Sequence, residues 1–192
     1  RHDYNANTSY ARYSVTSNLT LKPHKTTEIK LGIQGYLANA NYPAASNSSI
    51  FGAAFATQPN YIFPVYPNGY IADKPSGAVT NPYAILNEQG YAEQWRSQLF
   101  SNLKFTQQLP WITEGLSISG MFSFDIYSYT SNRYTRKPTT FMALGRDEDG
   151  YLVYQQTATG SEALSYARSS SGNREIYLEA AINDKRTFKE HD

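Results

Sequence analysis

The chain has 192 residues, a formal net charge of +1 and no Cys. The absence of Cys excludes disulfide frameworks and thiolate metal sites, and the near-neutral charge argues against a nucleic-acid partner, which would need a basic stripe. Only 17% of residues are charged whereas 15% are aromatic, which is Tyr-rich and charge-poor for a soluble domain. No run approaches the length of apolar sequence that a transmembrane helix needs. Transmembrane strands are not excluded, because the alternation of apolar and polar residues keeps their mean hydropathy low.

Five segments alternate apolar and polar residues with the period of two that predicts β-strands. They cover residues 9–22, 27–39, 92–109, 115–130 and 173–188. All are longer than the roughly five or six residues usual in soluble proteins, and long enough for the roughly 9–11 residues that cross a membrane. Aromatic residues lie at or near the ends of the apolar faces, Tyr13 and Trp95 at one end and Phe105 and Phe188 at the other. Such girdles are typical of membrane barrels.

The alternation also predicts which side chains share the apolar face of the sheet. These are Ile29, Leu31, Ile33, Leu99, Leu103, Ile118, Phe122, Phe124, Leu178 and Ile182. In a membrane barrel this face would meet lipid, and the polar face would line a wet lumen.

The connections between these strands are alternately short and long. Residues 23–26 and 110–114 form tight turns, whereas residues 40–91 and 131–172 form long loops. This rhythm is typical of outer-membrane barrels, which have short periplasmic turns and longer extracellular loops. The sequence therefore predicts an all-β fold, an antiparallel meander of long strands from a transmembrane β-barrel, with long extracellular loops carrying short helices.

The first long loop contains two helical signals. Residues 48–57 are Ala-rich, begin with a Ser that could cap a helix, and stop before Pro59. Residues 81–87 carry Pro82 at the first helical position. Both segments predict short helices.

The second long loop contains a hairpin signal. Residues 140–146 and 151–157 flank a turn that ends in Asp149-Gly150. We expect a helical turn at residues 161–166 and a flexible return to the sheet at residues 169–172.

Five different sequence segments occur along the chain in an order and spacing that are fairly specific. They are residues 13–21 (YSVTSNLTL) followed by a Thr-Thr turn, 50–54 (IFGAA) with Pro59, 81–84 (NPYA) with Asn87, 97–109 leading into 115–125, and 169–183. In this order they resemble the SusC/RagA family of TonB-linked outer-membrane proteins. Together they span nearly the whole chain.

The resemblance implies a barrel of about 22 strands plugged by an N-terminal domain. It also implies a SusD-like surface lipoprotein as a lid, coupling to the TonB complex, and an oligosaccharide or peptide substrate. Residues 1–192 would be a partial β-barrel domain in the bacterial outer membrane, comprising wall and extracellular loops, with the plug domain and TonB-binding regions outside it. The start at Arg1, with neither Met nor an apolar run, favours an interior piece of a longer precursor.

No pattern of catalytic or metal-ligating residues stands out. Asp147 and Asp149 could begin a calcium loop, but Tyr151 and the apolar residues after it do not supply the remaining ligands, so a turn is favoured. The three His residues are far apart and lack ligand spacing. Nothing places the carboxylates of Asp125 and Glu179 together for acid–base work. We therefore expect a non-enzyme with no cofactor and no metal site.

The one candidate binding site is an aromatic run in the first long loop, formed by Tyr61, Phe63, Tyr66 and Tyr70. Such rings can stack on a sugar or line a contact with a partner. The alternative is that they form the small core of their own loop, because a loop this long must pack on something. Taken ring by ring, the composition favours the second interpretation.

Two other architectures remain open. A soluble carbohydrate-binding or adhesin-like β-sandwich would also use Tyr-rich antiparallel sheets, but would bury its apolar faces against each other. An isolated open sheet would hide its apolar face by self-association, since five strands cannot close a wide barrel. The environment of the apolar face distinguishes these possibilities.

Overall fold

The computed structural model describes residues 8–58, 60, 62–76 and 78–186. The chain divides into two compact units. The sheet unit contains residues 11–39, 95–130 and 170 onward. The loop unit contains residues 40–94 and 131–169, with the chain up to Tyr10. Both long connections therefore fall in the same unit.

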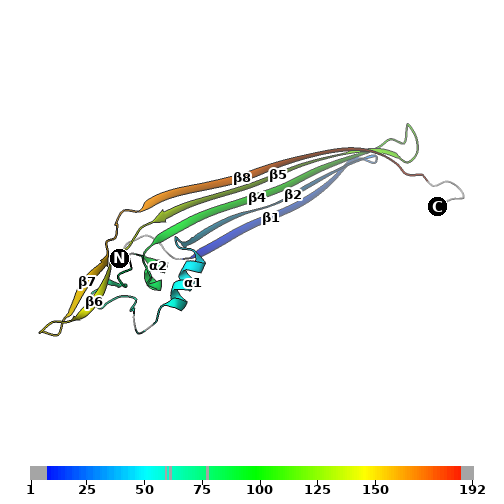
Figure 1. Ribbon diagram of the computed structural model, residues 1–192. Coiled ribbons are helices and arrows are strands. Elements are labelled where there is room, and N and C mark those ends of the chain that lie inside the picture. Colours follow the sequence, from blue (N-terminus) through cyan, green and yellow to red (C-terminus); the bar gives the residue numbers. More distant parts are fainter. Residues whose placement is uncertain (1–7, 59, 61, 77, 187–192) are drawn as a thin grey trace. The chain divides into compact units, whose positions relative to one another are not determined.

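Five long strands form one sheet in the order β1-β2-β4-β5-β8 (Figure 1). They are β1 (Ser9–His24), β2 (Thr27–Pro43), β4 (Gly90–Gln108), β5 (Leu116–Thr135) and β8 (Ser165–Asp184). Each is 16 to 20 residues long. The predicted antiparallel sheet of long strands in sequential order is confirmed. The first four strands begin within two residues of their predicted starts.

The fifth strand departs from its predicted start. We expected it to begin at residue 173, but β8 begins at Ser165, so the predicted helical turn at 161–166 and the flexible segment at 169–172 are wrong. The Ser-rich composition lacks the apolar alternation of a strand, yet these residues still join the ladder. A Cβ on Gly172 would lie 3.1 Å from the carbonyl oxygen of Tyr127 in β5. Pairing with a neighbouring strand has overridden local propensity.

Contacts between neighbouring strands define two faces of this sheet. A Cβ on Gly35 would lie 3.3 Å from the Leu99 side chain, and one on Gly32 would lie 2.7 Å from that of Asn102. Because side chains alternate along a strand, the odd-numbered apolar residues of β2 share a face with Leu99, and the even-numbered polar residues share the other with Asn102.

The polar face carries cross-strand polar contacts. The Arg12 guanidinium lies 4.0 Å from the centre of the Tyr36 ring, and the Asn183 amide donates to the Ser119 hydroxyl at 3.4 Å. The side chains predicted to be polar thus interact with one another across the sheet.

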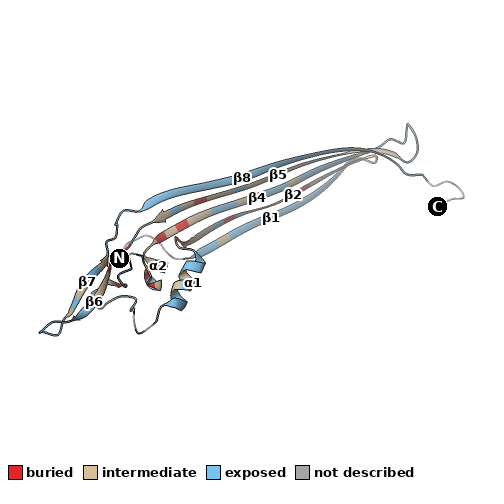
Figure 2. Ribbon diagram, viewed as in Figure 1, coloured by how far each residue is buried: buried red, intermediate tan, exposed pale blue. Residues whose placement is uncertain are grey.

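The apolar face is left open. Leu178 and Ile182 are 75% and 78% exposed, and the edge strands β1 and β8 are exposed along nearly their whole length (Figure 2). All described strands of the sheet unit belong to this one sheet, so no second layer from that unit covers the face.

Tight turns join the strands at the end remote from the long loops. Residues 25–26 connect β1 to β2, and residues 109–115 connect β4 to β5. Gly115 ends the second turn with φ +86°, and a Cβ there would lie 2.1 Å from the carbonyl oxygen of Lys185. Only Gly fits this position, because the left-handed conformation and the close approach both exclude a side chain.

The loop unit contains the remaining elements. They are α1 (Asn47–Ala56), β3 (Ile71–Ala72), α2 (Pro82–Asn87), β6 (Thr140–Arg146) and β7 (Leu152–Ala158). The predicted helices and the predicted hairpin are confirmed. A second small sheet has the order β3-β6-β7, with β3 parallel to β6 and β7 antiparallel to it.

The two helix starts are capped by side chains. The Ser46 hydroxyl, rather than that of Ser48, accepts a hydrogen bond from the Ser49 amide at 3.1 Å and caps α1. Asn81 caps α2 by accepting from the Tyr83 amide at 2.9 Å. No helix within the described ranges is long and apolar enough to cross a membrane.

Candidate functional site

The predicted aromatic stretch packs against the β6–β7 hairpin. Tyr61 lies outside the described residues. The Tyr66 ring meets Tyr154 edge-on at 5.0 Å between centroids. The Tyr70 ring stacks on Phe141 at 4.0 Å and meets Tyr154 edge-on at 5.4 Å. The structure thus brings Tyr66 and Tyr70 together around Tyr154. Tyr154 lies on β7, about eighty residues later in the sequence.

The rings differ in what they leave accessible. The Tyr66 hydroxyl accepts a hydrogen bond from the Ala143 amide at 3.0 Å, so its polar end is engaged by the hairpin. The centroid of the Phe63 ring lies 6.4 Å from that of Tyr66. Phe63 is 57% exposed and Tyr70 42%. Tyr66 is therefore mainly a packing residue, and Phe63 is the ring best placed to meet a ligand or a partner.

A buried polar pair holds this stretch in place. The Asn81 side-chain amide donates to the carbonyl oxygens of Phe63, Pro64 and Ala72 at 3.2, 2.9 and 2.7 Å. The Asp73 carboxylate accepts from the backbone amides of Lys74 and Thr80 at 2.8 and 2.7 Å, and from Asn81 at 3.3 Å. Both side chains are almost fully buried, where polar groups need partners. They fix the aromatic backbone to β3 and to the start of α2.

A hollow of about 420 Å³ lies beside the stacked rings. It is lined by both ring and charged residues, among them Tyr70, Tyr83, Phe141, Glu88, Arg136 and Glu162. Rings beside charged groups give the hollow surfaces for stacking and for hydrogen bonding.

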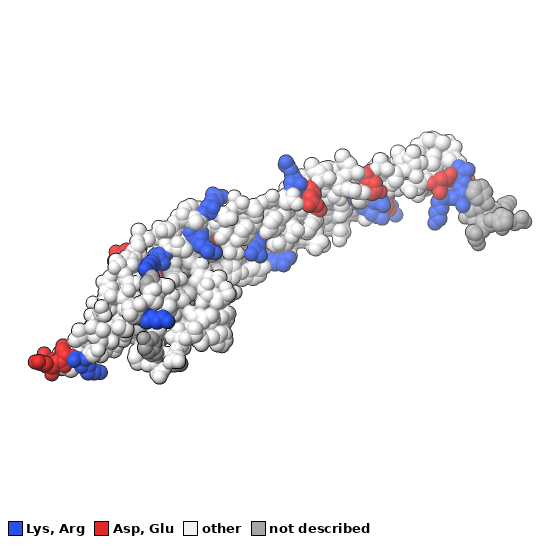
Figure 3. All heavy atoms as spheres, viewed as in Figure 1, with Lys and Arg blue, Asp and Glu red and all other residues white. Residues whose placement is uncertain are grey.

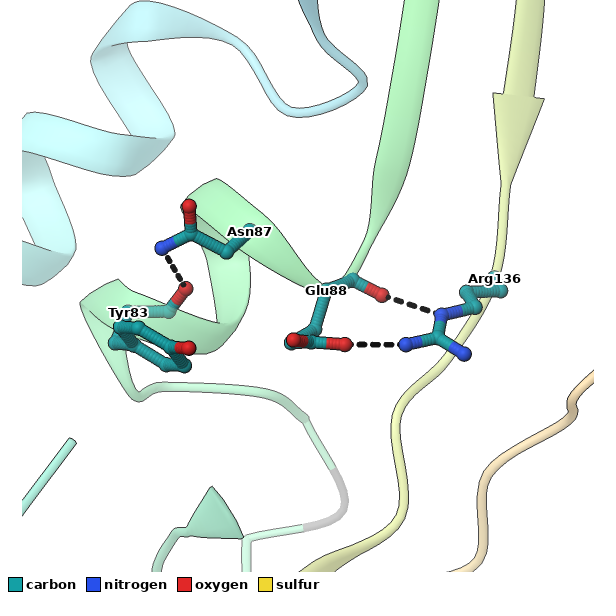
Figure 4. A network of polar contacts seen from close by, with 4 residues as sticks. All are labelled: Tyr83, Asn87, Glu88 and Arg136. Carbon is teal, nitrogen blue, oxygen red and sulfur yellow. Dashed lines mark hydrogen bonds and ion pairs between the residues drawn. The ribbon is translucent and has the colours of Figure 1, made fainter. Parts of the chain in front are cut away.

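An ion pair forms one wall of the hollow. Arg136 donates through Nε to the backbone carbonyl of Glu88 at 2.9 Å and through its terminal nitrogen to the Glu88 carboxylate (Figure 4). The Arg136 side chain is only 6% exposed and that of Glu88 is 24% exposed. Two bonds from one guanidinium fix its plane, so this pair holds the start of β4 to the segment after β5.

The hairpin tip is a turn rather than an ion site. The Asp147 carboxylate accepts hydrogen bonds from the amides of Asp149 and Tyr151 at 3.1 and 2.8 Å. Gly150 has φ +84°, as the predicted Asp-Gly turn requires. Acidic and basic groups are visible at this tip, while most of the face in view is uncharged (Figure 3). Within the described residues, no three His, Cys, Asp or Glu side chains group closely enough to hold a metal ion.

Sequence reasoning missed the residues that organise this region. Asp73, Asn81 and Arg136 each join segments far apart in the chain. The helical signal at residues 81–87 includes Asn81, but no local pattern indicates the three carbonyl groups that its side chain binds. Comparison of the chain with protein-family models, with curated proteins and with solved structures gives no match.

Proposed function

We propose that the chain forms part of the wall, and two extracellular loops, of a TonB-dependent importer of the SusC/RagA kind in the bacterial outer membrane. Its cargo would be an oligosaccharide or a peptide, and a SusD-like lipoprotein would cover the loops. The resemblance described above supplies the family, and the chemistry of the sheet supports a membrane setting.

The observation that carries the proposal is an exposed apolar face on strands of 16 to 20 residues. Contiguous exposed apolar surface of this kind marks a membrane or a protein contact. A sandwich would bury the face beneath a second sheet. In a bilayer, exposure to lipid leaves the same side chains favourably placed.

The length of the apolar band is consistent with a bilayer. On β5 the apolar positions run from Leu116 to Ile126. At about 3.3 Å per residue these positions cover about 33 Å of strand, or about 23 Å of bilayer thickness at a tilt of about 45°. The apolar band of an outer-membrane barrel is roughly 25 Å tall.

The edges of the sheet also favour a barrel. β1 and β8 each have a described neighbour on one side only, and an unpaired edge invites association. Five strands cannot close a wide barrel. Under the proposal, further strands pair with both edges.

Detergent dependence tests the membrane setting on the chain itself. The 192-residue chain would be unfolded in urea and diluted into buffer with or without dodecyl maltoside. We expect a soluble, β-rich product only with detergent, and aggregation without it. A folded monomer in detergent-free buffer, by sedimentation and circular dichroism, would overturn the proposal.

Within this function, we propose that the aromatic stretch of Tyr61, Phe63, Tyr66 and Tyr70 faces the extracellular vestibule and contacts the cargo or the lid lipoprotein. Partial exposure of Phe63 and Tyr70 supports this, as does the rigid anchoring by Asn81, which lowers the entropy lost on binding.

The sharpest variant is Phe63→Ala, because this ring is more than half exposed. Phe55→Ala is the matched control, since Phe55 is an exposed ring on α1 of the same unit. In the full-length protein we expect Phe63→Ala to weaken lid association or cargo uptake at normal surface expression. If Phe63→Ala, and also the double variant with Tyr61→Ala, gave wild-type values in both assays, the aromatic stretch would have only a structural role.

A further inference from the structure

A groove crosses the apolar face of the sheet at Gly35. Its volume is about 530 Å³, within the roughly 300–1,000 Å³ of small-molecule sites. Its apolar walls come from four strands, through Tyr13, Val15, Leu37, Leu99 and Ile126.

Gly35 interrupts the row of large side chains that borders the groove. The neighbouring positions of the same face on β2 are Ile33 and Leu37. A Cβ at Gly35 would lie 2.6 Å from the carbonyl oxygen of Gln98. A Gly inside a strand often marks a place where another backbone comes close, and here that backbone belongs to β4.

A second hollow, of about 350 Å³, continues the groove toward the long loops. The two share Tyr13, Leu37 and Ser97. Its further lining includes Trp95 and Ala38 together with the polar side chains of Asn39, Ser128 and Thr130. Arg96 also borders it, but its guanidinium lies 5.3 Å from the Tyr129 ring, on the polar face. The combined shape is mainly apolar, with hydroxyl and amide groups at one end.

We propose that this groove holds one acyl chain of a bilayer phospholipid, with the ester and glycerol groups at the hydroxyl and amide groups of the second hollow. The inference rests on the proposed membrane function. The Gly35 groove takes the hydrocarbon, and Trp95 and Tyr13 lie at the boundary where amphipathic rings meet headgroups. The hydroxyl and amide groups of Ser128, Thr130 and Asn39 in this rim suit neutral ester groups.

A peptide strand or a second copy fits the groove less well. The groove overlies the interior of the sheet, where β2 and β4 have neighbours on both sides, so their backbone groups are already paired. An incoming peptide would bring N–H and C=O groups with no partners there, which is costly away from water. An acyl chain has no such groups to satisfy.

The test fills the groove without disturbing the backbone. Ser97 lies at the junction of the two hollows, so Ser97→Phe would occupy the space of the chain. Ser17→Phe is the matched control, because Ser17 shares the face with Val15 by alternation and lines neither hollow. Both variants add the same ring to the lipid-facing side.

The probe is a phosphatidylcholine brominated on its acyl chain, added to the full-length protein in dodecyl maltoside micelles. Native mass spectrometry would count bound brominated lipid as its mole fraction rises, and unlabelled lipid would compete. We expect one saturable site in the wild type and in Ser17→Phe. Ser97→Phe should raise the half-saturating lipid fraction about tenfold, as when about two methylene groups lose their burial.

The outcomes separate this inference from the proposed function. Lipid retention that rises without saturation and is identical in all three proteins would overturn the groove while leaving the membrane setting intact. A protein that folds without detergent and retains no lipid would overturn both. Saturable binding that is unchanged by Ser97→Phe would place the lipid elsewhere and also overturn the groove.

Discussion

Buried side chains are concentrated in the loop unit, whereas the described residues of the sheet unit bury almost none. Of the buried apolar side chains in the described residues, only Ala38 belongs to the sheet unit, while Ala84 and Ile85 are among those in the loop unit. The buried polar residues, such as Asp73 and Asn81, all lie in the loop unit. The two units therefore differ in how many side chains they bury, although both expose large apolar residues, such as Phe55 in the loop unit and Leu178 in the sheet unit.

Under the proposed function, this difference reflects two different solvents. The loop unit buries several polar side chains and satisfies them with hydrogen bonds, as proteins in water do. The sheet satisfies its backbone by strand pairing and presents Leu, Ile and Phe outward, as strands in lipid do. The effect of a substitution on stability should therefore be that expected in water for the loop unit and that expected in lipid for the apolar face of the sheet unit.

The largest effect is expected at the ion pair of the loop unit. Glu88→Leu leaves the guanidinium of Arg136 buried without its carboxylate, which costs about 3–5 kcal/mol. Native-state hydrogen exchange should show the loop unit opening more easily, with β5 and β8 of the sheet unit unchanged. Glu162→Leu is the control, because this exposed carboxylate lines the same hollow and should have little effect. Equal effects from both variants would contradict the role given to the pair.

A charge on the apolar face is expected to have the next largest effect. Phe122→Arg in the full-length protein should lower stability in vesicles by roughly 2–4 kcal/mol, because an Arg would face lipid near the membrane centre. Ser123→Arg, its neighbour on the polar face, should cost little. Urea unfolding in lipid vesicles measures both. If the apolar face met water instead, the exposed Phe122 would tolerate Arg as well as Ser123 does.

Removal of the buried amide is expected to have a smaller, local effect. Asn81→Ala leaves three carbonyl groups without their donor, at a cost of about 1–3 kcal/mol. Exchange should quicken at residues 62–73 and at the start of α2. Asn87→Ala serves as the control, since its amide makes one exposed bond, to the Tyr83 carbonyl at 3.0 Å. Unchanged exchange at residues 62–73 in Asn81→Ala would show that the aromatic stretch is held by other contacts.

The smallest effect is expected from the stacked rings. Tyr70→Leu retains apolar bulk but loses the stack on Phe141, which is worth about 0.5–1.5 kcal/mol. Tyr151→Leu, at an exposed ring of the same hairpin, should be neutral. Thermal unfolding followed through the hairpin would compare the two. A neutral Tyr70→Leu would mean that the stack contributes no stability, which would favour a binding role for the ring.

The periodic parts of the fold were predictable and the long-range contacts were not. Alternation located the long strands, the Asp-Gly turn located the hairpin, and Pro82 at the first helical position located α2. The stretch from Ser165 to Gly172 was missed because its small polar residues show no period, although pairing with β5 suffices to extend the strand. The meeting of Glu88 with Arg136, and of Tyr70 with Phe141, depends on how the loops fold back. No local pattern encodes that.

The most direct test of the central claim, that one face of the sheet meets lipid, is an accessibility scan along β5. The 192 residues contain no Cys. In the full-length protein, with any Cys outside these residues replaced, single Cys residues at positions 118–126 would carry nitroxide labels after reconstitution in bilayers. Power saturation would compare oxygen, which concentrates in lipid, with a water-soluble nickel chelate. We predict strict alternation, with Ile118, Phe122 and Phe124 accessible to oxygen and Ser119 and Ser123 to nickel. Equal access to nickel at both sets of positions would contradict the account.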